Sequence, residues 1–295
     1  MSRVLVNGPA AWNTLVSVAE LPDPRPQMLL ARAHRQGLGG TSAGKAVTLA
    51  ALGVDVTLAT LVGDDEPGAH VRTALHRPGL ALLTSPVAVT EQHLNLMADD
   101  GSRVSIYLEL PAPPPAASPA VLEALVAADA AVLDLAESSR PLLVRAREAG
   151  VPVWCDVHDD DGLGEYARAF AQHADVLVVS EDGPADARAY LRAAVDAGAA
   201  LAVCTRGARG ALALDAGGWW EVGAAPARVV DTNGAGDAFV AGLLAATLAG
   251  LPRADALRHA AAAGALAVAS SELGAPDATP AAVEELARDV AVRRA

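Results

Sequence analysis

Apolar and polar positions alternate along the middle of the chain in a way that predicts strands and helices in turn. Four short apolar runs are typical of buried strands, at residues 131–135, 151–157, 176–180 and 201–205. Longer stretches with helical spacing of apolar positions lie between them, at about 119–128, 138–149, 163–173 and 184–197. This rhythm is typical of a mostly parallel sheet with helices on both faces. The predicted fold class is therefore α/β.

The two ends of the chain add elements that this rhythm does not explain. The N-terminal part contains predicted strands at 4–6, 13–18, 28–33 and 56–62, helices at 43–52 and 66–76, and a hairpin of 94–97 with 104–108. A second hairpin joins 211–214 to 219–222, and helices follow at about 235–249, 253–270 and 280–292. We expect one domain over residues 1–295, with a small β-sheet lid made of strands from about 10–38 and 90–109.

Composition and charge narrow the classes of partner. Hydrophobic residues make up 52% of the chain but aromatic residues only 3%, so the core is expected to consist of Ala, Val and Leu. The formal net charge is −13 without a visible Lys/Arg cluster, which argues against a nucleic-acid partner. No apolar run is long enough to span a membrane, and the N-terminus has no signal-peptide pattern. We therefore predict a cytoplasmic protein, with Cys155 and Cys204 as free buried thiols.

A glycine-rich stretch, GGTSAGKA at residues 39–46, fits the phosphate-binding pattern G-x-x-x-x-G-K-[ST] except at its last position. Ala46 stands where that pattern needs Ser or Thr to bind Mg²⁺. Residues 34–38 are also predicted to interrupt the strand that should run into the loop. We expect Lys45, the only lysine of the chain, on the helix surface, with a contact to the acceptor as the alternative. A Walker-type NTPase remains the alternative for this loop.

A second glycine-rich stretch, DTNGAGDAF at residues 231–239, precedes a long helix of small residues. Such a turn presents free N–H groups and the positive end of the helix dipole to an anion. Asp237 follows in the first helical turn, where it can accept a proton from a hydroxyl that attacks a phosphoryl group. The candidates for an anion hole are Gly234, Ala235 and Gly236. The alternative is a structural helix start, capped by Thr232 or Asn233.

The segment DTNGAGDAFVAGLL resembles the C-terminal signature of the ribokinase-like, or PfkB, kinases. Further stretches resemble that family in the same order along the chain, namely GLGGTSAGKAVTLAALG, TLVGDDEPG, CTRGARGALAL and ELGAPDATP. The resemblance covers essentially the whole chain. It implies a ribokinase-like three-layer α/β/α sandwich with a mostly parallel central sheet and a β-sheet lid. It also implies that the Gly-Gly turn contacts the phosphate acceptor rather than ATP.

The resemblance implies roles for individual residues. Asp237 corresponds to the catalytic base, next to the anion hole of residues 234–236. The residues implied for the nucleotide are Thr205, Arg206, Gly207, Gly210 and Asn233. Those implied for the acceptor, beside Asp237, are Asn13, Gly39, Gly40, Thr41 and Glu137. Asp231 corresponds to a position that helps to bind a monovalent cation in many relatives, so K⁺ is a candidate activator beside ATP and Mg²⁺.

The chain departs from the family pattern where the acceptor and the metal bind. Asn13 stands where sugar kinases of the family usually have Asp, and Gly44 stands where they usually have Asn. The expected Asn-x-x-Glu motif, which organises Mg²⁺ through water, is replaced by Ser-Glu-Asp-Gly at 180–183, and the candidate substitutes are Glu181 and, as the alternative, Asp182. Asp156 and His158 follow a strand end, where open α/β sheets bind ligands. They are candidates for Mg²⁺ or substrate contacts, with a solvated loop as the alternative.

These features predict an ATP-dependent, Mg²⁺-requiring kinase that transfers the γ-phosphoryl group to a hydroxymethyl group of a small sugar or sugar derivative. Because Asn13 and Gly44 replace the usual hydroxyl-binding pair, a nucleoside kinase is the alternative, with Trp12 stacking on the base. A non-catalytic ligand-binding member of the family is a further alternative. Lids of this kind often pair between subunits, so a homodimer through the lid is predicted.

Overall fold

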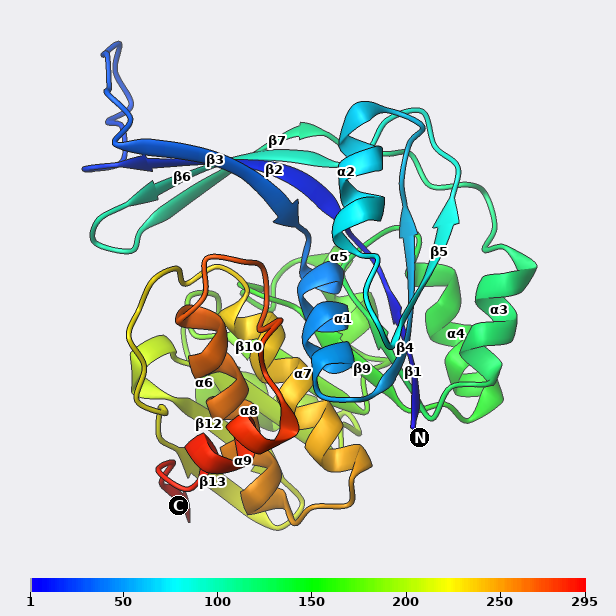
Figure 1. Ribbon diagram of the computed structural model, residues 1–295. Coiled ribbons are helices and arrows are strands. Elements are labelled where there is room, and N and C mark those ends of the chain that lie inside the picture. The colour runs from blue at the N-terminus through cyan, green and yellow to red at the C-terminus, as the bar shows by residue number, and fades with distance from the viewer. Residues whose placement is uncertain (1) are drawn as a thin grey trace.

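A large twisted sheet forms the body of the molecule in the computed structural model, which describes residues 2–295 (Figure 1). Its strand order is β14-β13-β12-β11-β10-β9-β8-β1-β4-β5. The seven strands from β11 to β5 are parallel, and β12, β13 and β14 add an antiparallel margin. The bounds are β1 Arg3–Asn7, β4 Asp55–Leu61, β5 Leu80–Ser85, β8 Ala130–Leu133, β9 Val153–Asp156, β10 Val176–Ser180, β11 Leu201–Thr205, β12 Ala211–Asp215, β13 Gly218–Val222 and β14 Val292–Arg294.

Helices cover both faces of this sheet, because successive residues of each buried strand point to opposite sides. In β1, Val4 and Val6 pack into one hydrophobic cluster and Leu5 packs into the other. The first cluster is covered by α1 Thr41–Ala51, α2 Glu66–Ala74, α7 Ala235–Leu248 and α8 Arg253–Val268, with α9 Pro280–Ala287 packed outside α7 and α8. The second is covered by α3 Pro119–Val126, α4 Arg140–Ala149, α5 Glu165–Ala171 and α6 Ala187–Asp196. The three-layer α/β/α arrangement was predicted.

A separate four-stranded sheet projects over one end of the body (Figure 1). Its order is β3-β2-β6-β7, with bounds β2 Ala11–Val18, β3 Ala33–Gly39, β6 Gln92–Ala98 and β7 Arg103–Glu109. These strands fall within the two segments from which the sequence predicted an additional sheet. Every residue of β7 is exposed, whereas the central strands β1, β8 and β9 of the large sheet are almost entirely buried.

Two predicted elements are wrong at their positions, and one strand was missed. Residues 28–30 are not a strand but part of an exposed segment, in which Met28 is 99% and Leu30 is 93% exposed. The strand instead runs through 33–39 into the glycine turn, because this segment pairs residue by residue with β2. The edge strand β5 was not predicted, and the last helix ends at Ala287 rather than at residue 292. In each case, the pairing between strands decided the outcome, and a single segment does not display that pairing.

The parallel strands of the large sheet end at one edge, called the carboxyl edge below, where open α/β sheets place their ligand sites. The small sheet joins the body here, since β2 begins shortly after β1 and β3 leads directly into α1. Cys155 and Cys204 are buried and unpaired, as predicted. Within residues 2–295, no helix is long and apolar enough to cross a lipid bilayer.

Candidate active site

The second glycine-rich stretch forms a tight turn at the N-terminus of α7. Gly234 caps the helix with a φ of 78°, a left-handed conformation that glycine adopts without strain. A Cβ atom at this residue would lie 2.8 Å from the backbone nitrogen of Gly274, so the close approach of the C-terminal segment also requires glycine. A Cβ atom at Gly236 would meet nothing within 4 Å. The turn therefore leaves space for an anion beside the N-terminal end of the helix dipole.

Asp237 lies in the first turn of α7 and is only 7% exposed. Its Oδ1 atom is 2.8 Å from the ammonium nitrogen of Lys45 on α1. Burial raises the pKa of the Asp237 carboxyl above its ordinary value, and the nearby Lys45 ammonium opposes that rise. A carboxyl with a raised pKa is a better proton acceptor once it is ionised, which suits a general base.

Lys45 is not on the helix surface, contrary to the expectation from the sequence, because its side chain is completely buried. Its Nζ atom lies 3.1 Å from Asp134 Oδ1, 3.2 Å from Asp156 Oδ2 and 2.8 Å from Asp237 Oδ1. Burial alone would lower the pKa of Lys45, but the three carboxylates, Asp134 foremost, hold that pKa well above the ordinary lysine value. An ammonium ion enclosed by carboxylates cannot bind ATP phosphates, so the Walker-type alternative is wrong.

The three carboxylates come from three different elements at the carboxyl edge. Asp134 directly follows β8, Asp156 ends β9, and Asp237 lies on α7. Asp156 accepts a hydrogen bond from the backbone N–H of His158 at 3.1 Å, and the two side chains approach to 3.5 Å. Burial raises the pKa of Asp156, but His158 and Lys45 together lower it below the ordinary value. The solvated-loop interpretation is therefore wrong for Asp156, whose side chain is 7% exposed.

Close packing of α1 against α7 brings the cluster together (Figure 1). A Cβ atom at Gly44 would lie 2.9 Å from Asp237 Oδ2, so any side chain there would press on the carboxylate. One turn later, Thr48 is buried and accepts a hydrogen bond from the backbone N–H of Ala275 at 3.0 Å. Glycine at residue 44 thus allows α1 to pack directly against the carboxylate.

The first glycine turn and β2 pack closely together on the candidate acceptor side. A Cβ atom at Gly39 would overlap the side-chain amide of Asn13. Gly40 has a φ of 94°, and a Cβ atom there would lie 2.4 Å from the carbonyl oxygen of Pro9. Asn13 is 4% exposed, and within residues 2–295 its Oδ1 atom has no hydrogen-bond partner. Ser42 does not cap α1; its hydroxyl donates to Asp134 Oδ2 at 2.6 Å, and the hydroxyl of Thr41 is 3.4 Å from the same oxygen.

The remaining acceptor candidates, Glu137 and Trp12, both contact other side chains of the protein. Glu137 is half-exposed and pairs with Arg140 at 3.4 Å, at the border of a hollow of about 370 Å³. Trp12 stacks on the ring of His70 in α2, with 4.8 Å between ring centroids and 17° between planes. Its ring therefore already has an aromatic partner, and the stacking on a nucleobase suggested by the sequence loses support.

The nucleotide candidates gather where β10 and β11 end. The backbone N–H of Glu181 donates to the carbonyl oxygen of Thr205 at 3.0 Å, which joins the two strand ends. A short 3₁₀ turn, Gly207–Arg209, follows β11, and Gly207 and Gly210 both adopt positive φ. Arg206 turns back and donates to the carbonyl oxygen of Ala211 at 3.3 Å, so it is not a free surface arginine. Glu181 forms an ion pair with the exposed Arg209.

The residues proposed for metal ions have protein partners. Asp231 accepts from Arg35 of β3 at 2.7 Å and from the backbone N–H of Asn233 at 2.8 Å. Both oxygens are thus engaged, which does not fit a cation ligand in this arrangement. Asn233 in turn accepts from Arg103 of β7 at 3.3 Å. Within residues 2–295, no group of three or more His, Cys, Asp and Glu residues is placed to hold a metal ion.

Sequence reasoning missed several members of this site. Asp134 was passed over in favour of Glu137, although a carboxylate directly after a buried strand marks the carboxyl edge. A lone lysine between Gly44 and Ala46, in a helix with a small-residue face, was the available sign for Lys45. Arg35 and Arg103 carried no comparable sign, because their contacts to residues 231–233 depend on how the small sheet lies over the body.

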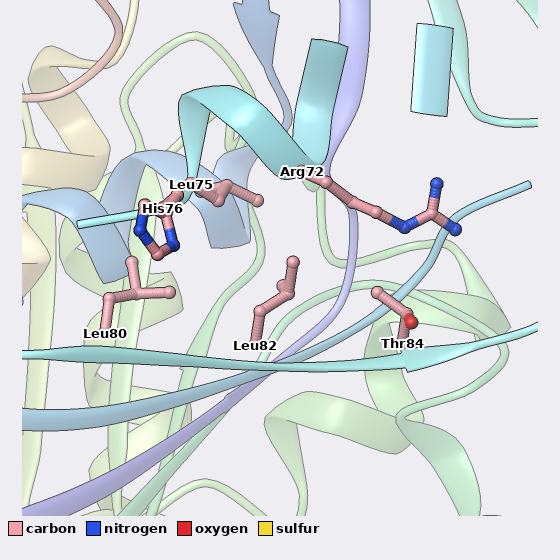
Figure 2. Close-up of a pocket in the computed structure, with 6 residues that line it drawn as sticks. All are labelled: Arg72, Leu75, His76, Leu80, Leu82 and Thr84. Carbon is pink, nitrogen blue, oxygen red and sulfur yellow. The ribbon is translucent and has the colours of Figure 1, made fainter. Parts of the chain in front are cut away.

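A surface hollow of about 320 Å³ between α2 and β5 lies apart from these residues. Figure 2 shows Leu75, which directly follows α2, facing Leu82 of β5 across the hollow, with the guanidinium of Arg72 pointing away from both leucines. Its lining residues, which include none of the site candidates, are Arg72, Leu75, His76, Leu80, Leu82 and Thr84.

Known proteins of similar sequence are phosphotransferases. An acarbose 7(IV)-phosphotransferase from Actinoplanes sp. is 34% identical over 284 residues, covering 93% of this chain and 95% of that protein. An ATP-dependent ribose-1-phosphate kinase from Halopiger xanaduensis is 31% identical, covering 90% of this chain and 92% of the other.

Solved structures agree with this likeness. A microbiome-derived acarbose kinase has a TM-score of 0.85 at 25% identity, covering 97% of this chain and 99% of that one. A ribokinase from Arabidopsis thaliana, complexed with ribose and ATP, has a TM-score of 0.78 at 22% identity, covering 98% and 99%, and supports the fold alone. Residues 1–280 match the family described as pfkB family carbohydrate kinase. The chain therefore belongs to the pfkB family of carbohydrate kinases.

Proposed function

We propose that this protein transfers the γ-phosphoryl group of ATP to a hydroxymethyl group of a small sugar or sugar derivative. One observation supports this most directly. The buried carboxylate of Asp237 lies in the first turn of α7, beside the glycine turn at the helix N-terminus. A proton acceptor and an anion site are thus adjacent, as in-line phosphoryl transfer requires.

In the proposed reaction, Asp237 accepts the proton of the acceptor hydroxyl while its oxygen attacks the γ-phosphorus. The N–H groups of the Gly234–Gly236 turn stabilise the negative charge of the transferring phosphoryl group. Asn13, with a buried and unpartnered Oδ1, offers a hydrogen-bond acceptor to a hydroxyl of the sugar, and the Gly39-Gly40 turn and Thr41 lie beside it. Glu137 would have to leave Arg140 before it could contact the acceptor.

Sugar-containing acceptors are favoured over free nucleosides by the relatives and by Trp12. The relatives named above act on acarbose and on ribose 1-phosphate, and a fructoselysine 6-kinase from Escherichia coli is 28% identical. A nucleoside kinase remains the second candidate, since an aminoimidazole riboside kinase from Salmonella typhimurium is 34% identical over 254 residues. Trp12, already stacked on His70, gives that candidate no further support.

The nucleotide is proposed to bind over Thr205, Arg206, Gly207 and Gly210, near Asn233. Mg²⁺ would arrive with the phosphates and keep several of its waters, with Glu181 as an indirect partner, because the described residues offer no complete protein site. The bound ion would neutralise charge on the transferring phosphoryl group. Asp231, held by Arg35, gives no support to K⁺ activation in this arrangement.

The small sheet is proposed to act as a lid within a single kinase domain of residues 1–295, in a cytoplasmic protein without nucleic-acid or membrane partners. Its inner face reaches the body, where Arg35 and Arg103 contact residues 231–233. The opposite face of β7 exposes three apolar side chains, those of Val104, Ile106 and Leu108. A second copy of the chain, covering this face, is the proposed partner.

The test of the kinase is ATP consumption by the wild type and by Asp237→Asn across acarbose, ribose, ribose 1-phosphate, fructoselysine, aminoimidazole riboside and inosine, with Mg²⁺ and with or without K⁺. We expect acceptor-dependent turnover that falls roughly 10²–10⁴-fold in the variant, the usual contribution of a general base. Arg145→Met, which removes an exposed cation of α4 paired with Glu148, is the control. Binding of an acceptor without turnover would favour the non-catalytic alternative.

The test of the dimer is the solution mass of the wild type and of Ile106→Asp. We expect a dimer that dissociates in the variant, because a buried carboxylate without a partner is costly. The matched control is Ser105→Asp, which introduces the same carboxylate on the opposite face of β7. A wild type that is monomeric at all concentrations would contradict the proposed partner.

A further inference from the structure

Four elements meet at the ammonium group of Lys45. The lysine extends from α1, and its three carboxylate partners come from the end of β8, the end of β9 and the start of α7. No part of the lysine side chain is exposed, and Asp134 is equally buried. A charge enclosed this completely is costly unless it is paired, so the pairing with Asp134, Asp156 and Asp237 is a built feature of the site.

The ammonium group has no donor left for a substrate. It has three N–H bonds, and three carboxylates approach it within 3.2 Å. An incoming sugar or phosphate would have to displace one of them. Lys45 therefore acts on the reaction through its partners, not through contact with the acceptor.

The contact with Asp237 is asymmetric. Lys45 holds Oδ1 at 2.8 Å, whereas Oδ2 lies against Gly44, where an added Cβ atom would come within 2.9 Å of it. Within residues 2–295, Oδ2 accepts no hydrogen bond. One oxygen is thus held by the ammonium group, and the other keeps its lone pairs free for a proton.

We propose that Lys45 is a positioning residue for the phosphoryl transfer: it fixes Asp237 by Oδ1 so that Oδ2 receives the proton of the acceptor. This inference rests on the proposed function. In that step the acceptor O–H bond breaks and its proton moves to Oδ2. The oxygen forms a bond to the γ-phosphorus, and the bond from phosphorus to the bridging oxygen breaks, its electron pair leaving with ADP.

Lys45 also keeps the base ionised. The cluster of three carboxylates and one ammonium has a net charge of −2 when all are ionised. The groups that face Asp237 are Lys45 on α1, Asp156 on β9 and His158 after it, with Asp134 across the lysine. Without the ammonium, Asp156 and Asp237 would repel each other, and Asp237 would take up a proton at a higher pH.

The experiment compares Lys45→Met with the double variant Lys45→Met/Asp134→Asn. The double variant keeps the cluster at a net charge of −2, because it removes one cation and one anion. We expect it to fold like the wild type but to lose about 100-fold in kcat, a typical cost of misplacing a reacting group. The KM for ATP should stay within about threefold, and the acid limb of kcat should move to higher pH. A kcat within about threefold of the wild type would overturn the proposal, because Lys45 would then only balance buried charge.

A second measurement needs no variant of Lys45. Lys45 is the only lysine of the chain, so selective isotope labelling of lysine gives one side-chain NMR signal. We expect this signal to shift with pH at the midpoint of the acid limb of kcat, and that transition to be absent in Asp237→Asn. A signal that does not respond in this pH range would overturn the proposal. A wild type without turnover on any acceptor would instead contradict the proposed function.

Discussion

The carboxyl edge of the large sheet contains two cation–carboxylate contacts that differ in burial. Beside Asp237, on the proposed acceptor side, Lys45 is fully buried among three carboxylates. At the ends of β10 and β11, on the proposed nucleotide side, Arg209 pairs with Glu181 while 71% of its side chain is exposed. The same type of contact therefore has two different uses. The cluster around Lys45 is held together by its own buried charges, whereas the exposed pair of Arg209 and Glu181 can separate at little cost.

The physical reason is the surrounding medium. An exposed pair is screened by water and loses side-chain entropy when it forms, so it stabilises the fold little. A buried pair interacts strongly, but each member becomes a liability when its partner is removed. Buried pairing thus fixes the position of the Lys45 side chain, whereas the exposed pair leaves Arg209 able to move. Variants at the two positions should therefore differ in their effects on stability.

The largest effect is expected from Lys45→Met. Removing the cation leaves three carboxylates close together in a buried site, and we expect the free energy of unfolding to fall by about 3–5 kcal/mol. Urea titration followed by circular dichroism measures this change. Arg209→Met, the matched loss of an exposed cation, should cost about 1 kcal/mol or less. If both variants lost the same free energy of unfolding, the buried and the exposed pair would not differ in their contribution to stability.

The next effect is on the rate and is expected from Gly44→Ala. Alanine favours a helix over glycine by about 1 kcal/mol, yet its Cβ would lie 2.9 Å from Asp237 Oδ2. We therefore expect at least about a tenfold lower kcat without a comparable loss of stability, measured by steady-state kinetics and thermal unfolding. Ala50→Gly in the same helix changes propensity in the opposite direction and should leave kcat unchanged. Full activity of Gly44→Ala would show that the close contact between Gly44 and Asp237 does not matter for the position of the base.

A smaller effect concerns pH. Burial raises the pKa of Asp237 above the ordinary aspartate value, with Lys45 opposing the rise. A base works only when ionised, so kcat should fall as pH decreases through this raised pKa. The acid limb should therefore lie above the range of an exposed aspartate, as a pH–rate profile would reveal. A kcat that is constant down to the ordinary aspartate range would contradict Asp237 as the base.

The smallest effect on stability is expected from Glu181→Gln. Because its partner Arg209 is exposed and Glu181 itself is only partly buried, the free energy of unfolding should fall by at most about 1 kcal/mol. If Glu181 helps to order Mg²⁺ and the phosphates, the KM for ATP should rise several-fold while the KM for the acceptor stays constant. Asp196→Asn, an exposed carboxylate on α6, serves as the control. An unchanged KM for ATP would remove Glu181 from the nucleotide site.

Much of the fold could be predicted because its signals are local. Apolar strands such as Val176–Ser180 and the glycine turn before α7 are recognisable within ten residues or so. The strand at 33–39 could not be predicted in this way, since both of its faces are largely exposed and only pairing with β2 defines it. The place of Lys45 was predicted wrongly for a similar reason: helical spacing shows the face that a residue occupies, but not the residues that the face meets.

The sequence by itself determined the α/β class, the family and the candidate base, because periodicity and the DTNGAGD turn are encoded in consecutive residues. Only the tertiary structure decided what surrounds that base. Asp134, Asp156 and Asp237 are separated along the chain by strands and helices, and they meet because parallel strands end at one edge while α1 packs against α7. The buried ammonium of Lys45 is stable only in that assembled environment, where charges distant in sequence compensate for its loss of water.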